Sequence, residues 1–383
     1  MNYRRLGRTG FRVSEIGLGG EYLEGKPLSL VKDVVDASLD GGINILDCFM
    51  SNPEVRTNLG IALKGRRDKV YIQGHFRSIW QDGQYGRTLD IDVTKHFFKD
   101  LLSRFQTDYM DIGMIHMLDN PSDYDAVFNG PILEYAMSLK EKGIIRSIGI
   151  STHNPVQALR AASSGIVDVI LFSINPAYDL LNENTPRPRK LDGTLFDQLE
   201  KIEGINSVRE QFYKYAESNS IGITVMKSLG AGALLDEKKS PFGKAMTVSQ
   251  CVNYALTRPG VASVMLGMES VDQVNSIIGF DKLNDEEKDY SFIFAEEPKF
   301  SMNGRCMYCN HCLPCSSHIN IAQVNKYLDL AVIDGIASPT LKAHYDSLEH
   351  KADECIGCGI CESNCPFGVK IVSRMKRAVE MFS

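Results

Sequence analysis

The sequence has little of what marks a membrane, secreted or nucleic-acid-binding protein. No apolar run approaches the roughly 20 residues that a transmembrane helix needs, and Met1–Arg5 leads into no apolar segment of the kind found in secretory signals. Lysine and arginine together number 42 against 48 acidic residues, for a formal net charge of −6, and they form no basic stripe. We therefore expect neither a membrane nor a nucleic-acid partner.

Low-complexity tracts and internal repeats are also missing, so we treat the chain as globular. Its 383 residues are 43% hydrophobic, which is enough to bury a large core. This length suggests two or three domains, although barrel folds exceed the usual size of a single domain. Cysteine is the residue type whose distribution is unusual.

Eight of the ten cysteines lie between residues 306 and 365, in two runs with short spacers. The second run, Cys355-x2-Cys358-x2-Cys361-x3-Cys365-Pro366, matches the bacterial ferredoxin signature for [4Fe–4S] clusters, in which the fourth thiolate reaches the other cluster. The first run ends one residue early and lacks the proline. We predict two [4Fe–4S] clusters with crossed fourth ligands, one held by Cys306, Cys309, Cys312 and Cys365, the other by Cys355, Cys358, Cys361 and Cys315.

Two other uses of these cysteines stay open on the residues alone. Structural zinc also takes Cys-x2-Cys pairs, but it needs four ligands per ion and rarely finds them at successive steps of three. Disulfides suit short secreted chains, and this chain is not short. Low-potential clusters and free thiolates favour a reducing, oxygen-poor interior, so we expect a cytoplasmic protein.

The first 280 residues or so alternate short apolar runs with amphipathic segments. The candidate strands are Ile16–Leu18, Ile43–Leu46, Val70–Gln73, Met110–Ile115, Ser147–Ile150, Val169–Ser173, Gly222–Met226 and Val264–Leu266. The candidate helices between them include Leu30–Asp40, Asp92–Phe105, Ile132–Lys142, Ser207–Ser218 and Thr247–Thr257. This alternation is typical of a (β/α)8 TIM barrel, an α/β fold. We predict a barrel over residues 1–284, followed by a small α+β ferredoxin-like domain over residues 285–383.

Three further segments refine this organisation. Tyr3–Ser14, with a turn at Gly7–Gly10, is expected to form a hairpin over the bottom of the barrel. The connection Asn182–Asn206, which contains Pro186–Lys190, has the size of a lid or a docking surface. A helix near Ile321–Ile336 is expected between the two cysteine runs.

Several barrel segments carry a family likeness. The opening Tyr3-Arg4-Arg5-Leu6-Gly7-Arg8-Thr9-Gly10 is similar to that of the aldo/keto reductases. The likeness continues in Val13-Ser14-x-Ile16-Gly17-x-Gly19, Gly42-Ile43-Asn44-x-x-Asp47, Asp108-Tyr109-Met110-Asp111 with His116, and Gly149-x-Ser151-Thr152-His153. Joined to the cysteine runs, the chain as a whole resembles the aldo/keto reductases that carry a C-terminal 4Fe–4S ferredoxin-like domain.

This resemblance implies a catalytic site at the strand ends, where the family uses Asp, Tyr, Lys and His. In that chemistry a nicotinamide delivers hydride to a carbonyl, while the Tyr donates a proton to the forming alkoxide. Asp47 and His116 match the family's Asp and His. Asn52 stands at the Tyr position and His75 at the Lys position. These four residues are the candidate catalytic set.

The two replacements change the expected proton chemistry. An amide such as that of Asn52 donates a hydrogen bond but gives up no proton near neutral pH. An imidazole at His75 replaces a fixed positive charge with a switchable one. If carbonyl reduction occurs, the acid is therefore His75, His116, or a tyrosine from a neighbouring loop such as Tyr22 or Tyr178.

The resemblance also places a dinucleotide site, although several of its residues depart from the family pattern. The candidate cofactor-binding residues are Ser151, Met226, Gly267, Glu269 and Gln273. Glu269 stands where a basic residue would meet a 2′-phosphate, and its carboxylate repels phosphate. We expect NAD(H) to be the dinucleotide if one binds, and NADP to be disfavoured.

A metal at the same strand ends is a third reading. Two histidines and one carboxylate, as in Asp47, His75 and His116, form the set that non-haem iron uses, and zinc also accepts it. The neighbouring Cys48 is expected to point into the layer between barrel and helices, because side chains alternate along a strand.

The leading hypothesis is an oxidoreductase that transforms a small carbonyl or alcohol in the barrel mouth, with electrons passing through the clusters. A ferredoxin or another redox protein is the candidate partner beside the small-molecule substrate. One alternative is a non-redox lyase or isomerase that uses His75 and His116 as acid and base, with structural clusters. Another is a non-catalytic electron-transfer module that docks a partner through Pro186–Lys190.

Overall fold

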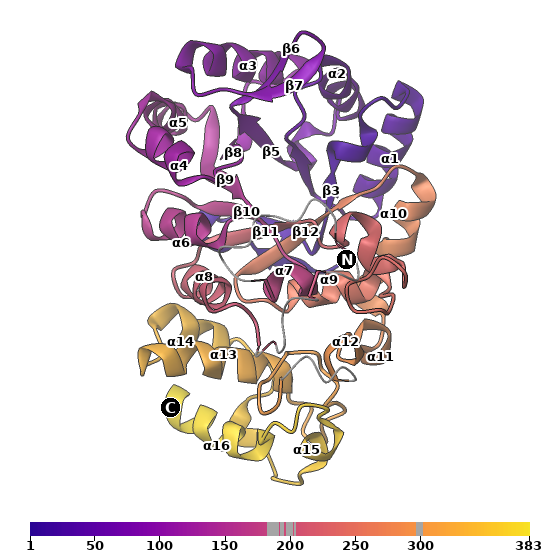
Figure 1. Ribbon diagram of the computed structural model, residues 1–383, viewed down its shortest axis with the longest axis vertical. Coiled ribbons are helices and arrows are strands. Elements are labelled where there is room, and N and C mark those ends of the chain that lie inside the picture. Colours follow the sequence, from indigo (N-terminus) through magenta and orange to yellow (C-terminus); the bar gives the residue numbers. More distant parts are fainter. Residues whose placement is uncertain (182–190, 192–194, 197–201, 203, 296–301) are drawn as a thin grey trace. The chain divides into compact units, whose positions relative to one another are not determined.

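The computed structural model describes residues 1–181, 191, 195–196, 202, 204–295 and 302–383. These residues form two compact units (Figure 1). The first unit comprises residues 1–174, 221–228 and 261–282, and the second comprises residues 175–220, 229–260 and 283–383. Most of the connection Asn182–Asn206, including Pro186–Lys190, lies outside the described residues. Within the described ranges, no helix combines the length and apolar character that crossing a membrane requires.

Eight parallel strands of the first unit close into a barrel, which confirms the predicted (β/α)8 fold. In the order in which they pair around the barrel, the strands are β10 (Val169–Ser173), β11 (Gly222–Met226), β12 (Val261–Gly267), β3 (Ile16–Gly19), β4 (Ile45–Cys48), β5 (Tyr71–Phe76), β8 (Met110–Ile115) and β9 (Ile145–Thr152).

Several of these strands run farther toward the barrel mouth than the apolar runs predicted, and β4 and β5 carry candidate site residues in the added part. β4 continues to Cys48 and β5 to Phe76, because Asp47 pairs with Gln73 and Cys48 with Gly74 in the parallel ladder. Backbone pairing rather than hydrophobicity therefore sets the ends of these strands. The extension places Asp47 and His75 inside regular strands, which gives their side chains fixed directions.

The N-terminal hairpin fills the bottom of the barrel, as expected. β1 (Tyr3–Arg5) pairs antiparallel with β2 (Arg12–Ser14). Leu6 and Val13 are fully buried in one apolar cluster with barrel residues such as Ile112 and Val169. Gly222 opens β11 directly against Leu6, where a Cβ atom would come within 2.7 Å of that side chain. The bottom is thus closed by packed side chains, which leaves the opposite end for chemistry.

Several helices of the first unit begin at polar caps. Asn52, Asp90, Asn154 and Ser270 each accept a backbone N–H in the first turn of the helix they precede, which satisfies groups that a helix end leaves unpaired. The α-helices described in this unit are α1 (Leu28–Asp40), α2 (Pro53–Ala62), α3 (Ile91–Arg104), α4 (Pro121–Phe128), α5 (Pro131–Glu141), α6 (Pro155–Ser163) and α10 (Val271–Ile278).

The described regular elements of the second unit are helices. They are α7 (Pro176–Asp179), α8 (Ser207–Ser218), α9 (Val248–Leu256), α11 (Asp285–Lys288), α12 (Phe292–Ala295), α13 (Ile321–Asp334), α14 (Pro339–Asp346), α15 (Ile360–Asn364) and α16 (Ile371–Phe382). The helix expected near Ile321–Ile336 ends at Asp334, because Gly335 takes the left-handed conformation that stops a helix. In residues 302–383, loops that carry cysteines take the place of the strands expected for an α+β domain.

Candidate active site and cysteine cavities

Neighbouring barrel strands bring the predicted strand-end residues together. Asp47 lies on β4, His75 on β5, and His116 directly follows β8, and these three strands are adjacent in the barrel. Gln73 lies two residues before His75 and therefore points to the same side of β5. All four side chains are buried, so each needs a hydrogen-bond partner within the protein.

Hydrogen bonds link these side chains into a continuous series. Asp47 Oδ1 accepts from Gln73 Nε2 at 2.8 Å and lies 3.0 Å from His75 Nε2. His75 Nδ1 lies 2.9 Å from His116 Nδ1. Thr224 on β11 donates to Gln73 Oε1 at 2.8 Å, which orients the amide so that its NH2 group faces Asp47.

The contact between the two imidazoles restricts their protonation. Only one proton fits between His75 Nδ1 and His116 Nδ1, so one ring donates and the other accepts. With Asp47 ionised, His75 Nε2 carries a proton and donates it to the carboxylate. A neutral His75 then accepts from His116, whereas a protonated His75 donates to it.

The series ends on a phenol that the sequence analysis did not name. Tyr85 Oη lies 2.6 Å from His116 Nε2. Tyr85 belongs to β7 (Gln84–Arg87), which pairs with β6 (Ser78–Gln81) in a two-stranded hairpin. It is 43% exposed, whereas the residues behind it are buried. We name the series Asp47, His75, His116 and Tyr85 the strand-end relay.

The sequence analysis named Tyr22 and Tyr178 as examples of tyrosines for this position, and Tyr85 is the one whose hydroxyl contacts His116. The Tyr22 ring packs on Gly267, where a Cβ atom would approach it to 2.1 Å. Tyr178 is buried in α7, which belongs to the second unit. The sequence signal for Tyr85 was Asp82-Gly83, a two-residue hairpin turn in which both residues have positive φ.

A buried arginine and an aromatic ring hold His116 in place. Arg77 donates to the His116 carbonyl at 3.1 Å, to the Thr88 carbonyl at 2.9 Å and to Asp123 at 3.1 Å. The Phe49 ring stacks on the His116 imidazole, with ring centroids 5.4 Å apart and planes 5° apart. Arg77 thereby ties the base of the Tyr85 hairpin to the backbone of His116.

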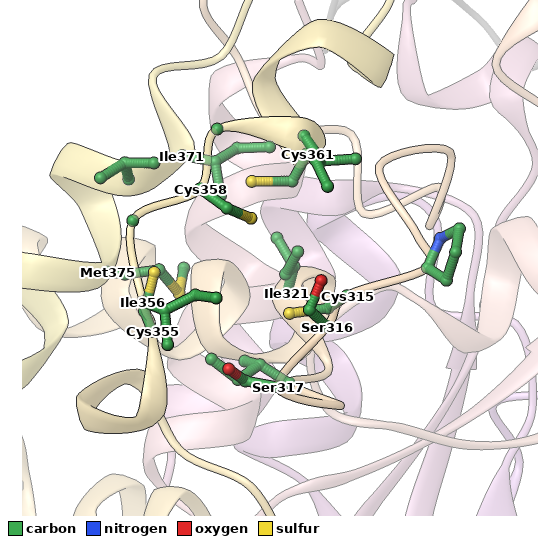
Figure 2. A pocket seen from close by; sticks show the side chains of 16 residues that line it. Cys315, Ser316, Ser317, Ile321, Cys355, Ile356, Cys358, Cys361, Ile371 and Met375 are labelled. Atoms are coloured by element: carbon green, nitrogen blue, oxygen red, sulfur yellow. The ribbon is translucent and has the colours of Figure 1, made fainter.

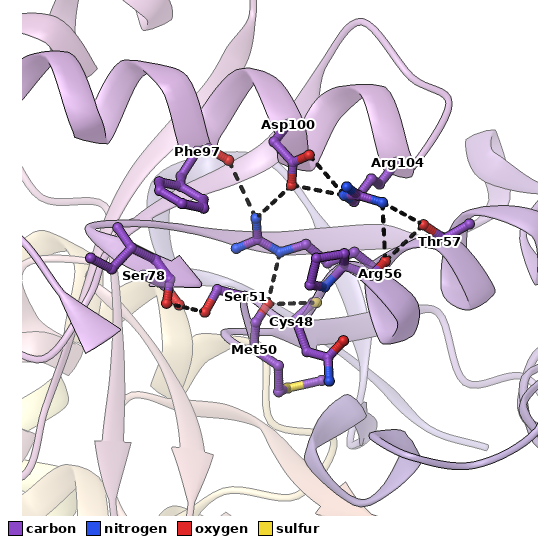
Figure 3. Close-up of polar contacts among 12 residues, drawn as sticks. Cys48, Met50, Ser51, Arg56, Thr57, Ser78, Phe97, Asp100 and Arg104 are labelled. Carbon is purple, nitrogen blue, oxygen red and sulfur yellow. Dashed lines mark hydrogen bonds and ion pairs between the residues drawn. The ribbon is translucent and has the colours of Figure 1, made fainter. Parts of the chain in front are cut away.

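The loop that carries Phe49 is itself fixed from the helix side (Figure 3). Arg56 of α2 is fully buried and donates to the Met50 carbonyl at 2.8 Å. The Ser51 hydroxyl donates to the Ile79 carbonyl, and the Ser78 hydroxyl to the Phe49 carbonyl. These two bonds join the loop after β4 to β6, so the first strand of the hairpin is anchored to that loop.

Cys48 lies in this helix-facing layer, as the alternation along β4 predicts. Its thiol is buried and lies 3.8 Å from the Met50 carbonyl, beside Arg56 (Figure 3). Burial raises the pKa of the Cys48 thiol to about 12. A protonated, enclosed thiol is inert, and Cys48 takes no part in the strand-end relay.

Burial also sets the charge of His116. Its removal from water lowers the pKa of His116 well below the ordinary value of 6.5, and His75, Arg87 and Arg77 lower it further by repulsion. His116 is therefore neutral at physiological pH, and it presents one ring nitrogen as a donor and the other as an acceptor.

The same hydrogen bonds disfavour a metal site at these residues. A metal ligand must direct a lone pair at a point shared with the other ligands. The two ring nitrogens of His75 instead contact Asp47 on one side and His116 on the other. Both ring nitrogens of His75 are therefore engaged with side chains rather than directed at a shared point.

Asn52 occupies a helix cap near the same strand end. Its side-chain oxygen accepts from the backbone N–H of Glu54 at 2.9 Å, at the start of α2. This bond directs the carbonyl of the amide to the helix, and the NH2 group remains the donor of the pair. The structure thus gives Asn52 a capping role, and its catalytic role stays a prediction.

The second unit contains two cavities, each lined by four cysteines. One, with about 290 Å³ of empty space, is lined by Cys306, Cys309, Cys312 and Cys365. The other, shown in Figure 2, has about 410 Å³ of empty space and is lined by Cys315, Cys355, Cys358 and Cys361. Each cavity therefore takes three cysteines from one run and one from the other.

The walls of these cavities fit iron–sulfur clusters. Apart from the thiols, the lining side chains are mainly apolar, including Ile321, Ile356 and Met375 in one cavity and Met307 and Phe367 in the other. Four thiolates in an apolar shell are the donor set of a [4Fe–4S] cluster.

Comparison with known families assigns both parts of the chain. The model of the aldo/keto reductase family matches residues 15–253, which is more than half of the sequence. The chain belongs to the aldo/keto reductase family. A second model, that of a 4Fe–4S dicluster domain, matches residues 305–370 and covers all eight clustered cysteines. The members of this family are oxidoreductases, and this one carries an iron–sulfur domain after the matched region.

Individual relatives share the barrel region. The aldo-keto reductase YhdN of Bacillus subtilis is 29% identical in an alignment of 197 residues, and the match covers 47% of this chain. That match spans 54% of the relative's own length, so the chain covers about half of it.

Solved structures show the same fold at low identity. The aldo-keto reductase AKR11C1 of Bacillus halodurans, in its holo form, aligns with a TM-score of 0.57 and 22% identity over 75% of this chain and 94% of its own. The putative aldo-keto reductase PA4992 of Pseudomonas aeruginosa aligns with a TM-score of 0.56 and 21% identity, over 73% and 93% of the two chains.

Three of the residues predicted to meet a dinucleotide, Ser151, Glu269 and Gln273, are hydrogen-bonded within the protein. Ser151 accepts from the Met117 N–H at 2.8 Å and lies 3.3 Å from His116 Nδ1. Glu269 pairs with Lys26 at 2.7 Å, and its N–H donates to Gln273.

Met226 and Gly267 are the last residues of β11 and β12, at the same end of the barrel. Their strand-end positions agree with a role in binding a dinucleotide at the barrel mouth, and that role stays a prediction.

Proposed function

We propose that this chain is an iron–sulfur oxidoreductase that interconverts a small carbonyl compound and its alcohol at the barrel mouth. The observation that carries this proposal is the hydrogen-bonded series of Asp47, His75 and His116 on adjacent strand ends. In TIM-barrel enzymes, the strand ends at this face of the barrel hold the catalytic groups. The barrel's membership in an oxidoreductase family supports the reaction type.

The strand-end residues have distinct roles in this proposal. Asp47 accepts from His75, fixes the orientation of its ring and stabilises its protonated form. His75 stands in for the family's lysine as a positive charge that comes and goes with a proton. His116 is neutral and links His75 to Tyr85 through its two ring nitrogens, while the NH2 group of Asn52 donates a hydrogen bond to the substrate.

The eight clustered cysteines hold two [4Fe–4S] clusters in the proposed enzyme. Cys306, Cys309, Cys312 and Cys365 hold one, and Cys355, Cys358, Cys361 and Cys315 hold the other. When bound, the clusters supply transfer of single electrons. A ferredoxin or another redox protein is the proposed partner in electron exchange, and a reducing compartment such as the cytoplasm suits both clusters.

NAD(H) is the proposed dinucleotide, and NADP is disfavoured. In this proposal the Glu269 carboxylate faces the position of a 2′-phosphate, and Lys26 pairs with that carboxylate at 2.7 Å. Ser151, Met226, Gly267 and Gln273 are the proposed neighbours of the bound dinucleotide. NADP would have to place its phosphate beside this carboxylate, which like-charge repulsion opposes.

Difference spectroscopy under argon tests this assignment. The purified protein is mixed with NADH or with NADPH, and the broad visible absorbance of oxidised clusters is followed. We expect NADH to bleach this band, subsequent addition of an aldehyde such as 4-nitrobenzaldehyde to restore it, and NADPH to act much more weakly. Clusters that respond to dithionite but to neither dinucleotide would show that no nicotinamide supplies the electrons.

The direct contact between His75 and His116 favours one other function. Two imidazoles that share a proton can act as acid and base in a lyase or isomerase without net redox change. Turnover that persists after the clusters are locked in one oxidation state would support this second function. Retention of every measured activity by a His116→Ala variant would instead point to an electron-transfer module without catalysis.

A further inference from the structure

We propose that Tyr85 is the group that protonates the substrate oxygen, and that Asp47, His75 and His116 store and deliver its proton. This inference rests on the proposed function, because it names the proton donor for the same reaction. It replaces the family's tyrosine with a phenol from a different element, the β6–β7 hairpin.

Exposure singles out Tyr85 within the strand-end relay. Asp47, His75 and His116 are buried, whereas Tyr85 is 43% exposed at the outer end of the series. A substrate oxygen that arrives from solvent reaches the phenol before it reaches the imidazoles. The 2.6 Å contact between Tyr85 Oη and His116 Nε2 connects that phenol to the buried part of the relay.

The relay has two fully hydrogen-bonded states that differ by one proton. In the loaded state, His75 is an imidazolium that donates to Asp47 and to His116 Nδ1. His116 then donates from Nε2 to the Tyr85 oxygen, and the phenol proton points outward. In the depleted state, His75 is neutral and accepts from His116, which in turn accepts from the Tyr85 hydroxyl. His116 is neutral in both states.

Carbonyl reduction converts the loaded state into the depleted one. A bound, reduced nicotinamide would supply the hydride that the carbonyl carbon accepts, and the C=O π electrons would become a lone pair on oxygen. That oxygen takes the Tyr85 proton. The proton on His116 Nε2 moves to Tyr85, and the proton on His75 Nδ1 moves to His116 Nδ1. The products are the alcohol, the oxidised nicotinamide and a neutral His75, and solvent reloads the relay.

The charges around the relay favour this direction of transfer. Arg77, Arg87 and His153 are the cationic or titratable groups that face His116 besides His75, and they oppose a positive charge on it. Arg77 also interacts electrostatically with Tyr85. Cations near the phenol stabilise the transient phenolate.

Tyr85→Phe tests the proposal directly. We measure NADH-dependent reduction of 4-nitrobenzaldehyde under argon, and we expect kcat to fall by about 100-fold or more, the usual contribution of a general acid, with KM nearly unchanged. The control is Tyr3→Phe, which alters a similarly exposed tyrosine whose hydroxyl donates to the Gly42 carbonyl. Near-normal kcat in Tyr85→Phe, together with a large loss in Asp47→Asn, would overturn the role of Tyr85 and leave the proposed function standing.

Two further measurements separate chemistry from structure. Replacing Tyr85 with 3-fluorotyrosine keeps the ring and makes the phenol more acidic. In the dependence of kcat on pH, the alkaline limb, where kcat falls, should therefore move to lower pH. An unmoved limb contradicts the proposal. If the wild-type enzyme reduces no carbonyl, the proposed function fails, and nitrogen-15 NMR of His116 still tests the relay. Tyr85→Phe must shift its Nε2 resonance, and an unchanged resonance refutes the contact.

Discussion

At the scale of the residue, Asn52 combines a structural and a proposed catalytic role that substitution can separate. Its oxygen caps α2 at 2.9 Å, and its NH2 group is the proposed donor to substrate. A carboxylate caps a helix as well as an amide does but donates no hydrogen bond. The two functions of one amide therefore depend on different atoms.

We expect Asn52→Asp to keep the thermal stability of the wild type and to lose carbonyl reduction by about tenfold or more, consistent with one lost hydrogen bond to the reacting oxygen. Asn52→Ala should lose the cap as well, at a cost of about 1 kcal/mol in the free energy of unfolding. Thermal melts and kcat values check both effects. Full activity in Asn52→Asp would show that the residue is only a cap.

His116 gives a prediction about pH. Because burial and nearby cations hold the pKa of folded His116 well below 6.5, the unfolded chain binds this proton first as the pH falls. The free energy of unfolding therefore falls, because of this residue, as the pH drops below about 6.5. Above that pH, His116 makes no further change to the free energy of unfolding.

We expect nitrogen-15 NMR to show a neutral His116 ring at pH 6, with His116→Gln used to assign its signals. The wild type should also lose more stability than His116→Gln between pH 7 and pH 5.5. A His116 ring that titrates with a midpoint near 6.5 would contradict this view of its environment.

At the scale of the element, buried polar contacts link the β6–β7 hairpin to the barrel. Arg77, in the left-handed conformation at the hairpin's base, bonds two carbonyls and one carboxylate. Ser51 and Ser78 add two more links to the loop after β4. The position of Tyr85 depends on these contacts.

We expect Arg77→Met to lower the free energy of unfolding by about 3 kcal/mol, since it leaves buried carbonyls without donors. It should also reduce kcat, because Tyr85 loses its fixed distance to His116. Arg66→Met is the matched control, since Arg66 also pairs with carboxylates, Asp36 and Asp40, but at the surface, where such pairs contribute about 0–1 kcal/mol. Equal effects of the two substitutions in urea unfolding would contradict the anchoring role.

At the scale of the whole molecule, the crossed sets of cysteines join the two ends of the C-terminal part. Cys365 lines the cavity of Cys306, Cys309 and Cys312, although it follows Cys361 in the sequence. Ile371 lines both cavities, so the two sites are neighbours. Each site takes three cysteines from one run and its fourth cysteine from the other run. Joining the two closes the long loop of chain that lies between them.

We expect Cys365→Ser to impair the cluster of Cys306, Cys309 and Cys312, and Cys315→Ser to impair the other one. Each variant, purified without oxygen, should retain about half of the wild-type iron and sulfide. Their EPR spectra in the reduced state should differ from each other and add up to features of the wild type. If Cys365→Ser instead impaired the cluster of Cys355, Cys358 and Cys361, the crossed assignment would be contradicted.

The sequence by itself determined the barrel, the N-terminal hairpin and the two groups of cysteines, because these depend on local patterns. Apolar alternation marks strands, and short spacers place several thiols in one loop. Asp47, His75 and His116 were also predictable, since parallel strands carry their final residues to a common end.

Only the tertiary structure decided how those groups meet. The bond from His75 to His116 and the contact of Tyr85 with His116 depend on distances between segments far apart in the chain, whereas the cap that Asn52 gives α2 is a local contact with Glu54. A sequence motif records spacing along the backbone, whereas a proton moves only across contacts of about 3 Å through space, which packing alone creates.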